Sequence, residues 1–130
     1  MDKPPKGRIL LVDDERDINT VVKKGLERVG FKVRAFDNPL DALSKFEDGS
    51  YDVALLDIRM PSMNGFELYK KLRERDSKIK VCFITAFEMY EEEFKKLFPS
   101  YQVRCFIKKP IKLTDLIAEI EKILLLSSSS

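Results

Sequence analysis

Acidic side chains follow two apolar runs of this sequence, at the point where each run ends. Asp13, Asp14 and Glu15 come directly after "RILLV", and Asp57 closes "YDVALLD". Neighbouring carboxylates repel one another by about 1 kcal/mol at ~4 Å in water and by several times more near a protein surface. If folding brings these acids together, a hard cation must neutralise them, and Mg²⁺ is the natural candidate because it prefers oxygen ligands. If folding keeps them apart, they are the acidic first turn of a helix.

Two later apolar runs also end in polar residues. Thr85 ends "KVCFIT", and Lys109 ends "VRCFIKK". A metal beside acidic side chains suggests phosphoryl transfer, in which a nearby cation such as Lys109 completes the neutralisation of charge. The short hydroxyl of Thr85 can hydrogen-bond a phosphoryl group. A carboxylate can itself be the nucleophile and form an acyl phosphate, and Asp57 is the candidate because it alone would project from the central strand.

Composition excludes several classes of protein. The length of 130 residues fits one domain, and a net charge of +2 is too small to indicate nucleic-acid binding by this domain. We find no apolar stretch of ~20 residues that would span a membrane. The start "MDKPPKGR" has no apolar signal core, so we expect a cytoplasmic protein. The chain has no histidine, which excludes histidine-ligated zinc, a Ser-His-Asp triad and a histidine phosphocarrier within it.

Apolar runs alternate with helical periods along the whole chain. The runs "RILLV", "FKVRAF", "YDVALLD", "KVCFIT" and "VRCFIKK" are each followed by a helical pattern, which predicts an α/β fold: a doubly wound, five-stranded parallel sheet with five helices on its two faces. In the flavodoxin-like strand order 2-1-3-4-5, the first and third strands are neighbours. That order would gather Asp13, Asp14 and Asp57 at the carboxyl ends of the strands, where such sheets bind ligands.

The expected domain occupies residues 8–126, with an N-terminal extension at 1–7 and a serine tail at 127–130 that is a linker or an artificial end. Cys82 and Cys105 lie inside two of the predicted strands, and we expect them to be buried thiols.

Four segments in this order resemble the receiver domain of two-component response regulators, of the chemotaxis-regulator-like type: "VDDE", "LLDIRMPSMNGFEL", "FITA" and "FIKKP". The resemblance covers the chain from about Arg8 to Leu126. It implies that Asp57 is the phosphoacceptor, modified by a histidine kinase or a phosphotransfer protein. It also implies that Mg²⁺ is held by Asp13, Asp14, Asp57 and the backbone carbonyl of Arg59.

The same resemblance assigns roles near the last two strands. It implies that Thr85 and Lys109 bind the phosphoryl group, that Thr85 and Phe106 are the switch residues, and that a cis peptide bond precedes Pro110. A homodimer or an output partner would use the face formed by the fourth helix, the fifth strand and the fifth helix. The predicted fourth helix, Met89 to about Phe98, is rich in aromatic residues, which indicates either extra core packing or such a partner surface.

Three functional classes follow from these residues. The first is a phosphorylation-controlled signalling switch, which is not an enzyme but assists its own phosphoryl transfer and hydrolysis. The second is a receiver-like protein-binding module that works without phosphorylation; such a module has usually lost Asp57, Lys109 or an acid, and here all are present. The third is an aspartate-nucleophile phosphatase, which usually has Asp-x-Asp after the first strand, whereas Asp13 and Asp14 are adjacent.

Overall fold

The computed structural model of the chain describes residues 4–86, 96 and 105–128. Their centre is a five-stranded parallel sheet in the order β2-β1-β3-β4-β5, the order expected from the sequence. Each of the four neighbouring pairs is parallel. The strands are β1 (Arg8–Val12), β2 (Lys32–Phe36), β3 (Val53–Asp57), β4 (Lys80–Thr85) and β5 (Phe106–Lys108).

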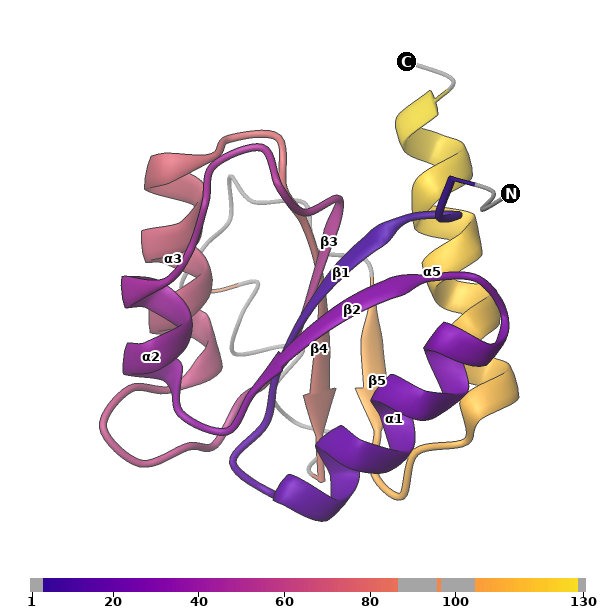
Figure 1. Cartoon of the computed structure of the whole chain (residues 1–130). Coiled ribbons are helices and arrows are strands. Elements are labelled where there is room, and N and C mark those ends of the chain that lie inside the picture. Colours follow the sequence, from indigo (N-terminus) through magenta and orange to yellow (C-terminus); the bar gives the residue numbers. More distant parts are fainter. Residues whose placement is uncertain (1–3, 87–95, 97–104, 129–130) are drawn as a thin grey trace.

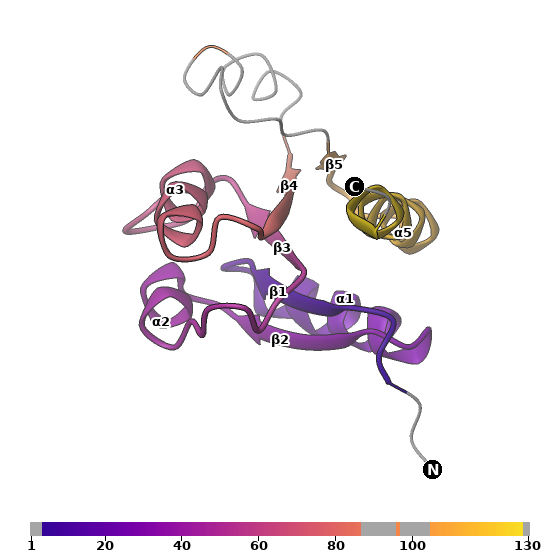
Figure 2. The same cartoon turned by 90° about the horizontal axis from the view of Figure 1, so that it is seen from above.

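Helices cover both faces of the sheet (Figures 1 and 2). Helices α1 (Arg16–Arg28) and α5 (Leu113–Ser128) pack on one face, and α2 (Pro39–Ser44) and α3 (Gly65–Arg75) pack on the other. The doubly wound architecture is therefore confirmed. The fourth helix that the sequence predicts, together with its aromatic residues, lies outside the described residues. Helix α5 runs to Ser128 and so includes the first two residues of the predicted serine tail.

Strands β1 and β3 lie deep in the core. Every residue of β3 is buried, as is every residue of β1 after Arg8. Along β1, Leu10 and Val12 pack with α2 and α3, while Ile9 and Leu11 pack with α1 and α5. Burying one such side chain stabilises the fold by about 1.5–3 kcal/mol. Because both faces of β1 and β3 are covered, their carboxyl ends, where Asp13 and Asp57 lie, are held firmly in place.

Local signals set the helix boundaries near these strand ends. Helix α1 stops before Gly30, which has φ +105°, a conformation that glycine adopts without steric cost. The Asn38 side chain caps α2 by accepting a hydrogen bond of 2.8 Å from the Leu40 amide. Helix α3 begins with a capping box between Asn64 and Glu67.

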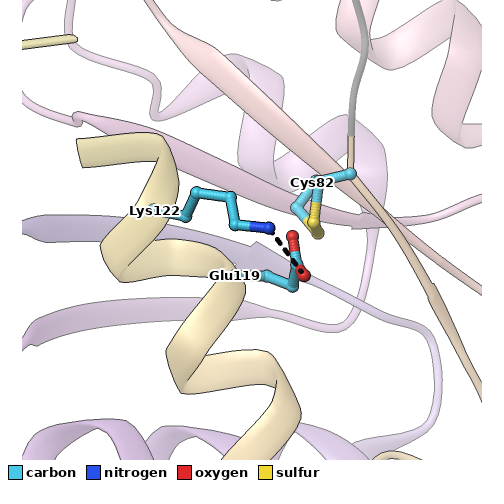
Figure 3. Close-up of a disulfide and its surroundings, with 4 residues drawn as sticks. Cys82, Glu119 and Lys122 are labelled. Carbon is cyan, nitrogen blue, oxygen red and sulfur yellow. Dashed lines mark ion pairs between the residues drawn. A yellow bond between two sulfur atoms is a disulfide. The ribbon is translucent and has the colours of Figure 1, made fainter. Parts of the chain in front are cut away.

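The cysteine prediction was wrong, because Cys82 and Cys105 form a disulfide (Figure 3). Strands β4 and β5 are neighbours, and Phe83 is paired with Phe106. The preceding residues, Cys82 and Cys105, therefore lie opposite each other, with a Cα–Cα distance of 4.6 Å. That separation lies within the range of protein disulfides. Both sulfurs are buried on the face that α5 covers. The bond joins the two strands that lead to Thr85 and Lys109.

Reduction of the disulfide should destabilise the protein. Its two cysteines are 23 positions apart. Breaking a disulfide that closes a loop of this size lowers the free energy of unfolding by about 2–4 kcal/mol. We expect dithiothreitol to lower the melting temperature of the wild type but not that of the Cys82→Ala/Cys105→Ala double variant. Equal melting temperatures of the wild type with and without reductant would show that the thiols are not bonded in solution.

Candidate functional site

Three acidic side chains meet at the carboxyl ends of the two central strands. Asp13 follows β1 and is fully buried, Asp57 ends β3 and is 5% exposed, and Asp14 beside them is exposed. One oxygen from each of the three carboxylates lies within 4.8 Å of the other two. The structure thus brings together the three acids that the sequence assigned to a metal site.

Lys109 faces this acidic cluster from beyond β5. Its Nζ lies 3.0 Å from Asp13 Oδ2 and 3.6 Å from Asp57 Oδ2. Its backbone amide donates a hydrogen bond of 2.7 Å to the carbonyl of Thr85, which ties it to the end of β4. The peptide bond between Lys109 and Pro110 is cis. Lys109 and Asp57, 52 positions apart by their residue numbers, are therefore in direct electrostatic contact.

An open pocket of about 180 Å³ lies over these residues. Thr85, 5% exposed at the end of β4, lines it together with Asp57 and Lys109. The exposed Arg59, two residues after Asp57, also reaches the pocket. The lining residues are Asp14, Glu15, Asp57, Arg59, Thr85, Ala86 and Lys109.

Burial and mutual repulsion shift the acid–base properties of the cluster. Burial, with the charge of Asp13 added, raises the pKa of Asp57 to about 7, although Lys109 opposes the rise. Burial also raises the pKa of Asp13, against the hydrogen bond from the Glu15 amide and the positive charge of Lys109. Burial lowers the pKa of Lys109, but its contacts with Glu15 and Asp13 outweigh this and raise the pKa overall. The cluster thus holds more negative charge than Lys109 alone neutralises.

The donor set fits a magnesium ion. Asp13 Oδ2 is buried and has no hydrogen-bond partner among the described residues, although it forms the ion pair with Lys109. Three carboxylate oxygens are hard ligands, and the cluster holds neither a histidine nor a cysteine. Mg²⁺ usually keeps several waters and takes one or two carboxylates plus a phosphate, which an open pocket allows.

Helix α3 packs against the end of β3 through its first residue, Gly65. The Gly65 amide donates a hydrogen bond of 2.8 Å to the carbonyl of Ile58. A Cβ added to Gly65 would lie 2.3 Å from the carbonyl oxygen of Asp57, closer than a side chain can approach. The sequence patterns above did not single out this glycine. They did not indicate that the glycine supports the backbone of the candidate phosphoacceptor.

Asn19 is a second supporting residue, and the sequence patterns above did not single it out. Its side-chain amide donates hydrogen bonds of 2.8 Å to the carbonyl of Asp13 and 3.1 Å to the carbonyl of Phe36. It is buried on α1 together with Val22 and Leu26. A signal was present, because a polar residue at the spacing of a buried apolar face needs internal partners.

Phe106 lies on the strand beside the one that carries Thr85. It is half-buried in β5, and its ring lies 5.5 Å from the ring of Phe83. Thr85 is paired with Lys108, two residues beyond Phe106. The two residues assigned to the switch thus lie on paired strands, two residues apart in register.

Comparisons with known proteins agree with this geometry. A family model described as the response regulator receiver domain matches residues 9–121. The chain belongs to this family. It is 36% identical to the response regulator receiver protein CpdR of Brucella abortus, across 91% of this chain and 97% of the relative. The transcriptional regulatory protein PcoR of Escherichia coli is 30% identical, and the match covers 90% of this chain but 51% of that protein.

Solved structures of receiver domains have the same fold. A receiver domain protein of Methanospirillum hungatei, described as CheY-like, superposes with a TM-score of 0.80 at 26% identity, covering 95% of this chain and 97% of that one. The response regulator TrrA of Thermotoga maritima, crystallised with Mg²⁺ and a beryllium fluoride, gives a TM-score of 0.78 at 29% identity, covering 90% and 98%.

Substitution of Gly65 by alanine should disturb the site as well as the fold. The added Cβ must displace the backbone at Asp57, so we expect a loss of about 2–3 kcal/mol in the free energy of unfolding and weaker Mg²⁺ binding. Gly49→Ala is the control, because Gly49 has φ +77° and open space around it, so strain of about 1–2 kcal/mol is expected without any effect on Mg²⁺. Equal Mg²⁺ affinities of the two variants would contradict this account.

Metal-free stability should fall as the pH rises from the unfolded pKa of Asp57, 3.8, to its folded pKa of about 7. The folded protein holds a proton on Asp57 up to about pH 7, whereas the unfolded chain releases it near 3.8. Between these values the folded state binds more protons, so the free energy of unfolding decreases with pH and levels off above the folded pKa. Urea unfolding in EDTA should show this decrease, and Asp57→Asn should reduce it. A slope of the same size in the variant would exclude Asp57 as its source.

Proposed function

We propose that this receiver domain is a phosphorylation-controlled switch whose phosphoacceptor is Asp57 and whose phosphodonor is a histidine kinase or a phosphotransfer protein. One observation carries the assignment: the Asp57 carboxylate lies within ion-pair distance of Lys109 and in the same oxygen cluster as Asp13 and Asp14. Asp57, Lys109 and Asp14 border one open pocket. Family membership supports the same role.

The chemistry follows from the positions of the side chains. An Asp57 oxygen attacks the phosphorus of a phosphohistidine, the phosphorus–nitrogen bond breaks, and the departing imidazole keeps the bonding electrons and takes up a proton. Lys109 contacts the oxygens of the transferred group, and the Thr85 hydroxyl donates a hydrogen bond to one of them. Asp13, Asp14, Asp57 and the Arg59 carbonyl would hold Mg²⁺, which neutralises the charge that develops on the phosphoryl oxygens.

Phosphorylation of Asp57 would change the structure at the edge formed by β4 and β5. A phosphoryl group adds about −1.5 to −2 charge and three acceptor oxygens beside Thr85. If Thr85 moves toward that group, it leaves space toward Phe106 on the neighbouring strand. Reversing a population from 1:99 to 99:1 requires about 5.5 kcal/mol, which a few charge-assisted hydrogen bonds supply. A homodimer or output partner would then bind the face that includes β5 and α5.

In this role the protein is a signalling switch rather than an enzyme that acts on a separate substrate. None of the helices within the described residues combines the length and apolar character that crossing a bilayer requires. A cytoplasmic location stays a prediction. The chain spans about half the length of several regulatory relatives that it matches.

Phosphorylation by a small donor tests the function. We expect Mg²⁺ and acetyl phosphate to add one phosphoryl group to the intact protein, and Asp57→Asn to abolish the addition, because Asp57 supplies the attacking oxygen. Asp41→Asn is the control, since it removes an exposed carboxylate from the first turn of α2. Intact mass and hydroxylamine-sensitive labelling report the outcome.

Two results would count against this function. Equal labelling of Asp57→Asn and the wild type would place the phosphoryl group elsewhere. Absence of labelling in the wild type, with Mg²⁺ bound and the fold intact, would favour the binding module that works without phosphorylation.

A further inference from the structure

Glu15 stands at the N-cap of α1 but does not cap the helix. Its backbone is extended, with φ −88° and ψ 104°, and its side chain makes no capping hydrogen bond. N-cap positions favour Ser, Thr, Asp and Asn, whose short side chains bond the free amides of the first turn. The Glu15 carboxylate instead accepts a hydrogen bond of 2.7 Å from Lys109 Nζ.

Glu15 makes the shortest of the three ion pairs that Lys109 forms with the described residues. The distances from Nζ are 2.7 Å to Glu15, 3.0 Å to Asp13 and 3.6 Å to Asp57. The Asp13 and Asp57 side chains are 0% and 7% exposed, whereas the Glu15 side chain is 58% exposed. An exposed carboxylate can turn into water at little cost, but the two buried ones cannot. Glu15 is therefore the partner that Lys109 can exchange.

Glu15 and a phosphoryl group on Asp57 would contact Lys109 in the same pocket. Glu15, Asp57 and Lys109 line the same pocket of about 180 Å³. An ammonium has only three N–H donors, and those of Lys109 already face three carboxylates. A phosphoryl oxygen on Asp57 and the Glu15 carboxylate would thus compete for the same donor, and both are anionic.

We propose that Glu15 is a positioning residue that occupies the phosphate place on Lys109 in the unphosphorylated protein and must leave it before the phosphoryl group is bound. This inference rests on the proposed function of Asp57 and Lys109. The Glu15–Lys109 pair stabilises the unphosphorylated state, so it slows phosphoryl transfer to Asp57 and weakens the binding of phosphoryl analogues. The identity of this one residue would set how readily the switch is turned on.

Two substitutions separate the contact from the charge. Glu15→Gln keeps the size of the side chain but removes its charge. Glu15→Asp keeps the charge on a side chain that is one methylene shorter and suited to capping α1, so it draws away from Lys109. Asp17→Asn is the matched control, because it removes the same charge from the first turn of α1, where Asp17 has no contact with Lys109 among the described residues.

The experiment measures the initial rate of acetyl phosphate labelling at saturating Mg²⁺. Both Glu15 variants should be labelled about threefold to fivefold faster than the wild type, the effect of losing one partly exposed ion pair. Both should also bind beryllofluoride more tightly by a similar factor. Asp17→Asn should match the wild type. Glu15→Asp should in addition melt at a higher temperature, so faster labelling would not reflect a loosened fold.

A double-variant cycle shows whether Glu15 acts through Lys109. In a Lys109→Ala background, Glu15→Gln should leave the beryllofluoride midpoint unchanged. A shift as large as in the wild-type background would overturn the inference, as would faster labelling of Glu15→Gln but not of Glu15→Asp. If the wild type is labelled at Asp57 and neither Glu15 variant differs from it, the inference fails while the proposed function stands. If the wild type is not labelled, both fail.

Discussion

The electrostatic imbalance around Lys109 is the constraint on which the site depends. Four carboxylates, those of Asp13, Asp14, Glu15 and Asp57, gather around one lysine at the pocket. At an effective dielectric of 20, two unit charges 4 Å apart interact by about 4 kcal/mol, so the repulsion is not negligible. Burial, with this repulsion added, raises the pKa of Asp57. Positive charge from Mg²⁺ would relieve it, and a phosphoryl group would then change the balance again.

The packing of the hydrophobic sheet keeps these negatively charged side chains close together. The strands β1 and β3 are buried on both faces, so the acids at their ends cannot separate without exposing the core. The Asn19 side chain donates a hydrogen bond to the carbonyl of Asp13, and Gly65 lets the start of α3 lie against Asp57. Lys109 is tied to β4 through the carbonyl of Thr85. Core packing, a buried amide and one close backbone approach thus hold like charges together.

Much of this arrangement could be predicted because it follows from short-range patterns. The apolar runs located the strands, and the strand order 2-1-3-4-5 placed Asp13 and Asp57 side by side. The disulfide could not be predicted in the same way, because it depends on the register of β4 against β5, which apolar runs do not specify. The contact of Glu15 with Lys109 was missed for a similar reason. The side chain of an N-cap residue is expected to bond its own helix, and only the folded structure shows that it turns away.

The most direct measurement is a crystal structure of the protein with Mg²⁺ and beryllofluoride. The account predicts beryllium bonded to an Asp57 oxygen, Mg²⁺ on Asp13, Asp14 and Asp57, and Lys109 Nζ turned from Glu15 to a fluoride. A structure in which the beryllium is bound elsewhere, or in which Mg²⁺ avoids the three acids, would contradict the central claim.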